Sequence, residues 1–281
     1  MKWRGRRQSQ NVEDRRGRSS GRKVAVGGGL GAIIILILSL VTGTDLSGLL
    51  QFIESPTIET TEPKRESLPD DETAQMVSTV LASTEDIWDH LFQEQGRTYQ
   101  KPNLVMFDYA TSSACGQASS AMGPFYCPGD NKVYIDLSFC QDLKTRFQAP
   151  GDFAVAYVIA HEVGHHVQNL LGISQQVQSM RQQMSTVEYN KLSVKMELQA
   201  DFLAGIWGYY AENMQDLLDK NDLEEALQAA YAIGDDRIQK QTQGYVVPDA
   251  FTHGSSQQRM YWFKRGFDTG DLSLGEFNKI Q

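Results

Sequence analysis

Apolar residues recur every three to four positions along much of the chain, which is the spacing of helices with one buried face. One such pattern begins near residue 73 and stops before Gly96, and another runs from residue 152 to a stop at Gly172. Helices are predicted for residues 73–95, 152–171, 174–184, 188–212, 222–241 and 255–267. Helices therefore make up most of the predicted fold.

Three shorter apolar segments lack this spacing and contain mainly residues that favour strands. They cover residues 103–109, 125–127 and 132–139, and a Pro-Gly-Asp-Asn turn joins the last two. Residues 112–123 show no strong period and are predicted as a loop. The pattern predicts an α+β fold that is mostly helical, with a small sheet preceding helix 152–171.

The N-terminal region has a different pattern. Residues 24–43 are uncharged and mostly apolar, and about 20 such residues suffice to cross a bilayer as a helix. Residues 1–23 contain nine Lys and Arg against two acidic residues. The positive-inside rule then predicts a single-pass anchor with a cytoplasmic N-terminus and an extracytoplasmic body. A cleaved signal peptide and a buried soluble helix are alternatives, and the uncleaved anchor is favoured.

Residues 44–72 are rich in Thr, Ser, Pro and acidic residues and have no sustained periodicity, so they are predicted as a linker. The chain is thus divided into a basic cytoplasmic head (1–23), a transmembrane anchor (24–43), this linker and a folded domain (73–281). At 281 residues and 41% hydrophobic content, the chain is long and apolar enough to bury a sizeable core.

The net charge of -9 conceals an asymmetry, because a head of +7 leaves -16 on the remaining residues. An acidic body is a poor surface for nucleic acid, so binding to DNA or RNA is not expected. Cys115 and Cys127 flank a glycine-containing loop and could form a disulfide in an oxidising compartment. Cys140 is left over and is interpreted as a small buried residue. The sequence does not indicate an oligomeric state.

Helix 152–171 contains the segment His-Glu-Val-Gly-His, which matches the pattern H-E-x-x-H. His161 and His165 lie about one turn apart on one helix face and can bind one metal ion. Glu162 lies beside that face, where its carboxylate can reach a water without being a ligand. Short motifs also occur by chance, but buried imidazoles in an apolar helix need partners. We therefore interpret the segment as a site for one zinc ion.

A catalytic zinc has three protein ligands, so one more donor is required. Glu197 is the candidate, and Asp201 lies one turn further along the same apolar helix. Two carboxylates on one buried face are unfavourable unless a cation compensates them. Glu197 is predicted to bind the zinc, and Asp201 to accept a hydrogen bond from a ligand histidine. The alternative is a pair of ordinary surface acids.

The remaining histidines are interpreted separately. His166 points about 100° away from His165 and is expected to pack or to support the site rather than bind the metal. His90 is expected to be structural or solvated. His253 lies at a junction between a loop and helix 255–267. It could be a ligand, a donor to a developing oxyanion or a residue near a helix cap, and the donor role is preferred.

With these residues in place, the chain resembles the bacterial putative neutral zinc metallopeptidase family along nearly its whole length. The resembling segments are residues 3–9, 11–16, 123–128, 133–139, 160–166, 196–201, 232–236 and 251–255. Related sequences often have a cysteine directly after the position of Asp201 and another near the C-terminus. Here Phe202 and residues 274–277 stand at those places, so a second disulfide is not expected.

The resemblance implies a membrane-anchored, zinc-dependent peptidase of the bacterial cytoplasmic membrane. Peptides or proteins would be its substrates. The residues themselves suggest the chemistry, in which Glu162 takes a proton from the attacking water and His253 stabilises the oxyanion. An edge strand within residues 132–139 is expected to pair with an extended substrate. The alternative function is a membrane-tethered binding or scaffold protein with a non-catalytic zinc.

Overall fold

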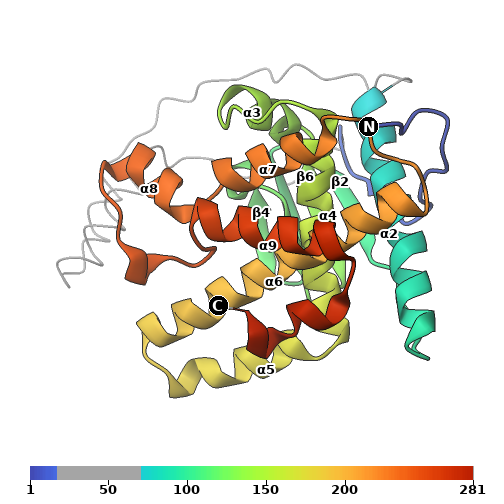
Figure 1. Ribbon diagram of the computed structural model, residues 1–281. Coiled ribbons are helices and arrows are strands. Elements are labelled where there is room, and N and C mark those ends of the chain that lie inside the picture. The colour runs from blue at the N-terminus through green and yellow to red at the C-terminus, as the bar shows by residue number, and fades with distance from the viewer. Residues whose placement is uncertain (18–70, 281) are drawn as a thin grey trace, which may run out of the picture. The chain divides into compact units, whose positions relative to one another are not determined.

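The computed structural model describes residues 1–17 and 71–280 (Figure 1). Residues 1–16 and 71–280 belong to one compact unit. The structure therefore places most of the predicted basic head in the same unit as the body. The predicted anchor, residues 24–43, and nearly all of the predicted linker lie outside the described residues. Within the part of the chain that is described, no helix is long and apolar enough to cross a membrane.

A four-stranded sheet has the order β1-β2-β6-β5. The strands β1 (Val12–Asp14), β2 (Asn103–Phe107) and β6 (Lys132–Asp136) are parallel, whereas β5 (Phe125–Cys127) runs antiparallel to β6. The last four residues of β2 are each at most 1% exposed, so both faces of this strand are covered. Burial on both faces explains why β2 is a continuous apolar run rather than an alternating one.

The predicted strand 132–139 is wrong at its C-terminal end. Strand β6 stops at Asp136, and helix α3 (Ser138–Thr145) begins two residues later. The Asp136 carboxylate accepts hydrogen bonds from the backbone N–H groups of Ser138 and Tyr109, both at 2.8 Å, and from the Ser120 hydroxyl. A short polar side chain that bonds its own backbone two residues on favours a turn, which ends the strand.

The predicted loop 112–123 also contains regular structure. Strands β3 (Ala110–Ser113) and β4 (Gly116–Ser119) form an antiparallel hairpin. Only Thr111 and Ala118 are buried in this hairpin, so no apolar alternation marks it in the sequence. A disulfide between Cys115 and Cys127 connects the hairpin turn to strand β5.

The predicted helices are present, most of them within a few residues of their expected bounds. They are α2 (Glu72–Glu94), α4 (Asp152–Leu170), α5 (Ile173–Met180), α6 (Thr186–Asn213), α7 (Asp222–Ala232), α8 (Asp235–Gln243) and α9 (Ser256–Thr269). Short 3-10 turns occupy Ser120–Met122, Arg181–Gln183, Pro248–Ala250, Leu272–Gly275 and Phe277–Lys279. Capping boxes at Ser185 and Ser255 set the first residues of α6 and α9. The mostly helical α+β prediction is thus confirmed.

One predicted helix, 222–241, is two helices in the structure. Gly234 separates α7 from α8, and a Cβ atom at this glycine would lie 2.3 Å from the backbone nitrogen of Ser256. The chain must therefore turn where the start of α9 approaches it. The Asp235 carboxylate, which follows the break, accepts hydrogen bonds from the backbone N–H groups of Thr252, His253 and Gly254.

Helix α4 lies at the centre of the unit, packed against α2, α6 and α7 and against strands β5 and β6 (Figure 1). Its residues 153–164 are all buried. Helix α6 packs on α4 and also crosses α9 at two glycines. A Cβ atom at Gly205 would lie 2.0 Å from the Phe263 carbonyl oxygen, and one at Gly266 would lie 2.1 Å from the Phe202 carbonyl oxygen. The two helix backbones thus touch without side chains between them.

We expect Gly205→Ala to lower the free energy of unfolding by about 3 kcal/mol, at the upper end of the cost of overpacking, because backbone atoms cannot move aside as a side chain can. Urea unfolding followed by circular dichroism measures this change. Gly208→Ala is the matched control on the same helix, since its nearest neighbour is the Phe267 ring at 2.9 Å. A Gly205→Ala protein as stable as Gly208→Ala would contradict the close backbone contact.

Candidate metal centre

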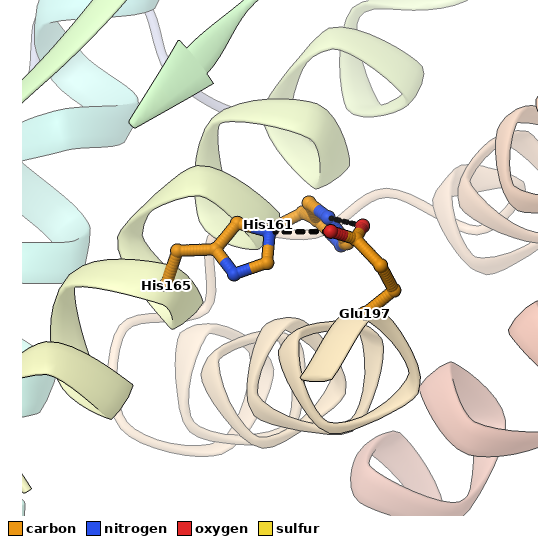
Figure 2. A group of neighbouring side chains, drawn as sticks. All are labelled: His161, His165 and Glu197. Carbon is orange, nitrogen blue, oxygen red and sulfur yellow. Dashed lines mark hydrogen bonds and ion pairs between the residues drawn. The ribbon is translucent and has the colours of Figure 1, made fainter. Parts of the chain in front are cut away.

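Helices α4 and α6 bring three candidate ligands together (Figure 2). His161 and His165 come from α4, and Glu197 comes from the facing turn of α6. The helices approach closely because Gly164, between the two histidines, lies against the backbone of Ala200. A Cβ atom at Gly164 would be 3.0 Å from the Ala200 carbonyl oxygen. The glycine inside the H-E-x-x-H segment therefore allows Glu197 to reach the histidines.

The geometry of these donors fits a zinc ion. Glu197 Oε2 is 3.1 Å from His161 Nε2, and Glu197 Oε1 is 3.4 Å from His165 Nε2 (Figure 2). The three ligand atoms lie within 4.8 Å of one another. Two imidazole nitrogens and one carboxylate oxygen are a donor set typical of catalytic zinc, which leaves a fourth position for water or substrate. The residues present therefore fit one zinc ion.

The outer nitrogen of each histidine has a partner that orients the ring. His161 Nδ1 lies 2.8 Å from Asp201 Oδ1, and His165 Nδ1 lies 2.9 Å from Gln168 Oε1. The Gln168 amide nitrogen donates to the Met196 carbonyl oxygen at 2.7 Å, so its oxygen is free to accept from His165. Because both Nδ1 atoms are directed at these acceptors, Nε2 of each ring faces Glu197 and is the atom that would bind a metal.

A buried arginine completes the support of His161. Arg259, on α9, is 3% exposed, and its Nε and Nη2 donate to the two oxygens of Asp201 at 2.9 and 3.0 Å. The Tyr157 hydroxyl donates to Asp201 Oδ1 at 2.5 Å. Burial by itself raises the pKa of the Asp201 carboxyl, but Arg259 and His161 outweigh it and hold that pKa below its usual value. Asp201 therefore stays ionised beside His161 in a site without bulk water.

Sequence reasoning identified Asp201 but missed Arg259, Tyr157 and Gln168. A signal for Arg259 exists, since Trp262 and Phe263 follow it by three and four positions, and both are buried. A charged residue on the same helix face as two core aromatics must have a buried partner. Gln168, three residues after His165, likewise lies on the face of α4 that carries the histidines.

Glu162 lies on the cleft next to the candidate ligands. Its side chain lies on the cleft that His161 and His165 also line, and the residue is 8% exposed. Burial raises the pKa of the Glu162 carboxyl above its usual value, although the neighbouring His165 and His161 act in the opposite direction. A carboxylate with a raised pKa accepts a proton more readily, which suits a general base.

The cleft beside the candidate ligands has a volume of about 650 Å³. Its walls are largely apolar and come from the Ser120–Pro128 segment, from α3, α4 and α8, and from the residues around His253. Phe125, Phe139, Phe147, Val158 and Ile238 are among the apolar side chains that line it. A volume of this size accommodates several atoms of a substrate backbone together with a side chain.

The structure places His253 on this cleft and not among the candidate ligands. Its Nδ1 is 3.1 Å from Asp235 Oδ1, and its side chain is half-exposed. The hydrogen bond to Asp235 raises the pKa of the His253 imidazole, while partial burial acts in the opposite direction. A protonated His253 would present N–H donors to an anion that forms in the cleft.

The other histidines and the free cysteine lie apart from the candidate ligands. His166 is fully buried, with Nδ1 3.0 Å from the Tyr126 hydroxyl and Nε2 2.5 Å from the Gln100 carbonyl oxygen. His90 is exposed, with its Nε2 3.4 Å from Glu94 Oε1. Burial raises the pKa of the Cys140 thiol to about 12, which makes a thiolate nucleophile unfavourable.

Comparison with known proteins agrees with this arrangement. The sequence model of the family described as "Putative neutral zinc metallopeptidase" matches residues 1–276. The chain is 53% identical over 279 residues to the uncharacterized protein YpfJ of Escherichia coli K12, covering 96% of each chain. It is 44% identical over 186 residues to the uncharacterized protein Rv2575 of Mycobacterium tuberculosis, covering 63% of this chain and 62% of the relative. No solved structure matches the chain. The chain belongs to the putative neutral zinc metallopeptidase family.

Proposed function

We propose that the protein is a zinc-dependent peptidase that hydrolyses peptide bonds in peptides or proteins. The observation that carries this proposal is the convergence of His161, His165 and Glu197 on one point, with Glu162 beside them on an apolar cleft. A purely structural zinc site has four protein ligands and no need for a base. The family description, which names a metallopeptidase, supports the same function.

Each residue then has a defined task. His161, His165 and Glu197 would hold the zinc, which when bound supplies Lewis acidity toward the scissile carbonyl and the attacking water. Glu162 takes the proton of that water and later delivers it to the leaving amine. His253 donates a hydrogen bond to the oxyanion. Asp201 and Gln168 keep the two imidazoles in the tautomer that a metal requires.

The strand expected to pair with a substrate, within residues 132–139, is not at the edge of the sheet. Strand β6 lies between β2 and β5, so both of its edges are already hydrogen-bonded, and the expected pairing of a substrate with residues 132–139 is wrong. Strand β5 is the edge of the sheet on that side, and its residues Phe125 and Tyr126 line the cleft. We propose that an extended substrate adds to the free edge of β5.

Removing the metal tests the proposed function directly. The purified full chain is expected to contain one equivalent of zinc and to release peptides from an unfolded protein. Chelation should abolish that release, and added zinc should restore it. Glu197→Ala is expected to weaken zinc binding by more than about 100-fold, measured by chelator competition. Bound zinc without any cleavage would instead indicate a binding or scaffold protein with a non-catalytic zinc.

The pH dependence tests His253. Because Asp235 raises the pKa of His253, the imidazole stays protonated to higher pH than it would alone. Asp235→Asn removes the charge and keeps an acceptor oxygen, so the pKa of His253 should fall. The alkaline limb of the pH profile of kcat/KM is then expected to move to lower pH. Asp249→Asn, at an exposed position, is the control. An unmoved limb would exclude the donor role.

Membrane attachment rests on residues 24–43, which lie outside the described part of the chain. Anchoring in the bacterial cytoplasmic membrane therefore stays a prediction from the sequence. The disulfide between Cys115 and Cys127 supports an oxidising compartment for the body.

A further inference from the structure

Strand β1, residues 12–14, forms one edge of the central sheet. Strand β1 pairs in parallel with β2, with Val12 opposite Leu104 and Asp14 opposite Met106. The backbone N–H of Leu104 donates to the Asn11 carbonyl oxygen at 2.8 Å, and that of Arg15 donates to the Met106 carbonyl oxygen at 2.8 Å. Residues 11–15 of the predicted head thus share backbone hydrogen bonds with a core strand of the body.

The head also contacts the first residue of helix α4, the helix that carries His161 and His165. Trp3 is 6% exposed and belongs to the main hydrophobic core. Its indole nitrogen donates to Asp152 Oδ2 at 3.0 Å, and Asp152 is the first residue of α4. The backbone N–H of Lys2 donates to the Leu217 carbonyl oxygen at 2.8 Å, so the head contacts the chain just beyond α6 as well.

The basic residues of the head have specific partners on the body. Glu85, on α2, is 1% exposed, and its carboxylate accepts hydrogen bonds from Asn11 Nδ2 at 2.7 Å, from Arg7 at 3.2 Å and from the Ser9 hydroxyl. Arg16 forms an ion pair with Asp71. A buried carboxylate needs such partners, so the body is built to receive this head.

We propose that the head and the body lie on the same side of any membrane that the intervening segment enters. A single crossing between residues 17 and 70 would put β1 and β2 on opposite faces of the bilayer, which their hydrogen bonds do not allow. Four of the positive charges that predicted a cytoplasmic N-terminus, those of Lys2, Arg4, Arg7 and Arg16, form ion pairs with the body. This inference replaces the topology predicted from the positive-inside rule, and it does not depend on the proposed function.

Accessibility of single cysteines tests the proposal in the full chain. In a Cys140→Ala background, Gln8→Cys marks the head and Tyr245→Cys marks the body, both at exposed positions. A membrane-impermeant maleimide is added to sealed spheroplasts and, separately, to detergent-opened ones. We expect the maleimide to react with both variants in sealed spheroplasts, or with both only after the spheroplasts are opened with detergent. Labelling of Tyr245→Cys in sealed spheroplasts with protection of Gln8→Cys, or the reverse, would overturn the proposal.

Hydrogen exchange checks the docked head without reference to a membrane. In the purified full chain, the amides of residues 103–107 are expected to exchange slowly. Trp3→Ala should speed their exchange at least about tenfold, while peptides from α9 change little. Arg4→Ala removes an exposed ion pair to Glu72 and is the matched control. Exchange of residues 103–107 that is fast in the wild type, or unaffected by Trp3→Ala, would show that the head is not docked.

Discussion

Glu162→Gln is expected to lower kcat/KM for peptide hydrolysis by a factor of about 10² to 10⁴, the usual range for loss of a general base. The amide has nearly the same shape as the carboxylate but cannot take the proton of the attacking water. Zinc content should not change, because Glu162 is not among the three residues whose donor atoms converge. The measurement is a steady-state assay on a quenched peptide, with zinc determined by atomic absorption on the same preparation.

Glu224→Gln is the control for this substitution, since it makes the same chemical change at an exposed position on α7. It should leave both zinc content and kcat/KM at the wild-type level. A Glu162→Gln protein that kept its zinc and cleaved as fast as Glu224→Gln would rule out Glu162 as the base. Loss of zinc from Glu162→Gln would instead indicate that Glu162 helps to hold the metal.

Arg259→Met is expected to reduce the free energy of unfolding by about 3 to 5 kcal/mol, the typical cost of removing one partner from a buried ion pair. Methionine fills a similar volume, but it leaves the Asp201 carboxylate, which is fully buried, without its cation. Because Asp201 orients His161, zinc affinity should also fall by about 10- to 100-fold. Denaturant unfolding of the metal-free protein and chelator competition measure the two effects separately.

A double-mutant cycle with Asp201→Asn tests whether the two residues act on each other. If the cost of Arg259→Met comes from the unpaired carboxylate, it should be smaller in the Asp201→Asn background. Arg265→Met, on the same helix but only partly buried, controls for the change of side chain. Equal costs of Arg259→Met in both backgrounds would show that Arg259 contributes by packing and not through Asp201.

The parts of the candidate site that the sequence predicted share a local signal. His161, Glu162 and His165 follow one another within five residues of one helix, and Glu197 and Asp201 stand one turn apart in an apolar stretch. Helical periodicity fixes their relative directions, so their grouping follows from spacing and burial. Arg259 is 58 residues from Asp201 in sequence, and its importance depends on how α9 crosses α6. No periodicity encodes such a crossing.

The strands show more clearly that local sequence signals do not predict contacts between distant segments. Most helix starts were predicted within a few residues because the apolar periodicity that marks a helix is local. Strand β1 has three residues, none of them buried, and it pairs with a strand far along the chain. The basic residues around this strand were interpreted by the positive-inside rule, which predicted a cytoplasmic N-terminus instead of a docked strand. Only the positions of their partners, such as Glu85, explain why those charges are there.

The parallel pairing of β1 with β2 also bears on the order in which the chain folds. Val12 opposes Leu104, a separation of 92 residues (104 minus 12), and Lys2 bonds to Leu217, 215 residues later (217 minus 2). Lys2 and Val12 leave the ribosome long before these partners, so they form their contacts late. Such distant contacts slow folding, because a long loop must close before any contact stabilises it. In a nascent chain that ends before Leu217, part of the hydrophobic core that contains Trp3 has not yet been made. Apolar surface therefore stays exposed, which makes early intermediates targets for chaperones and proteases.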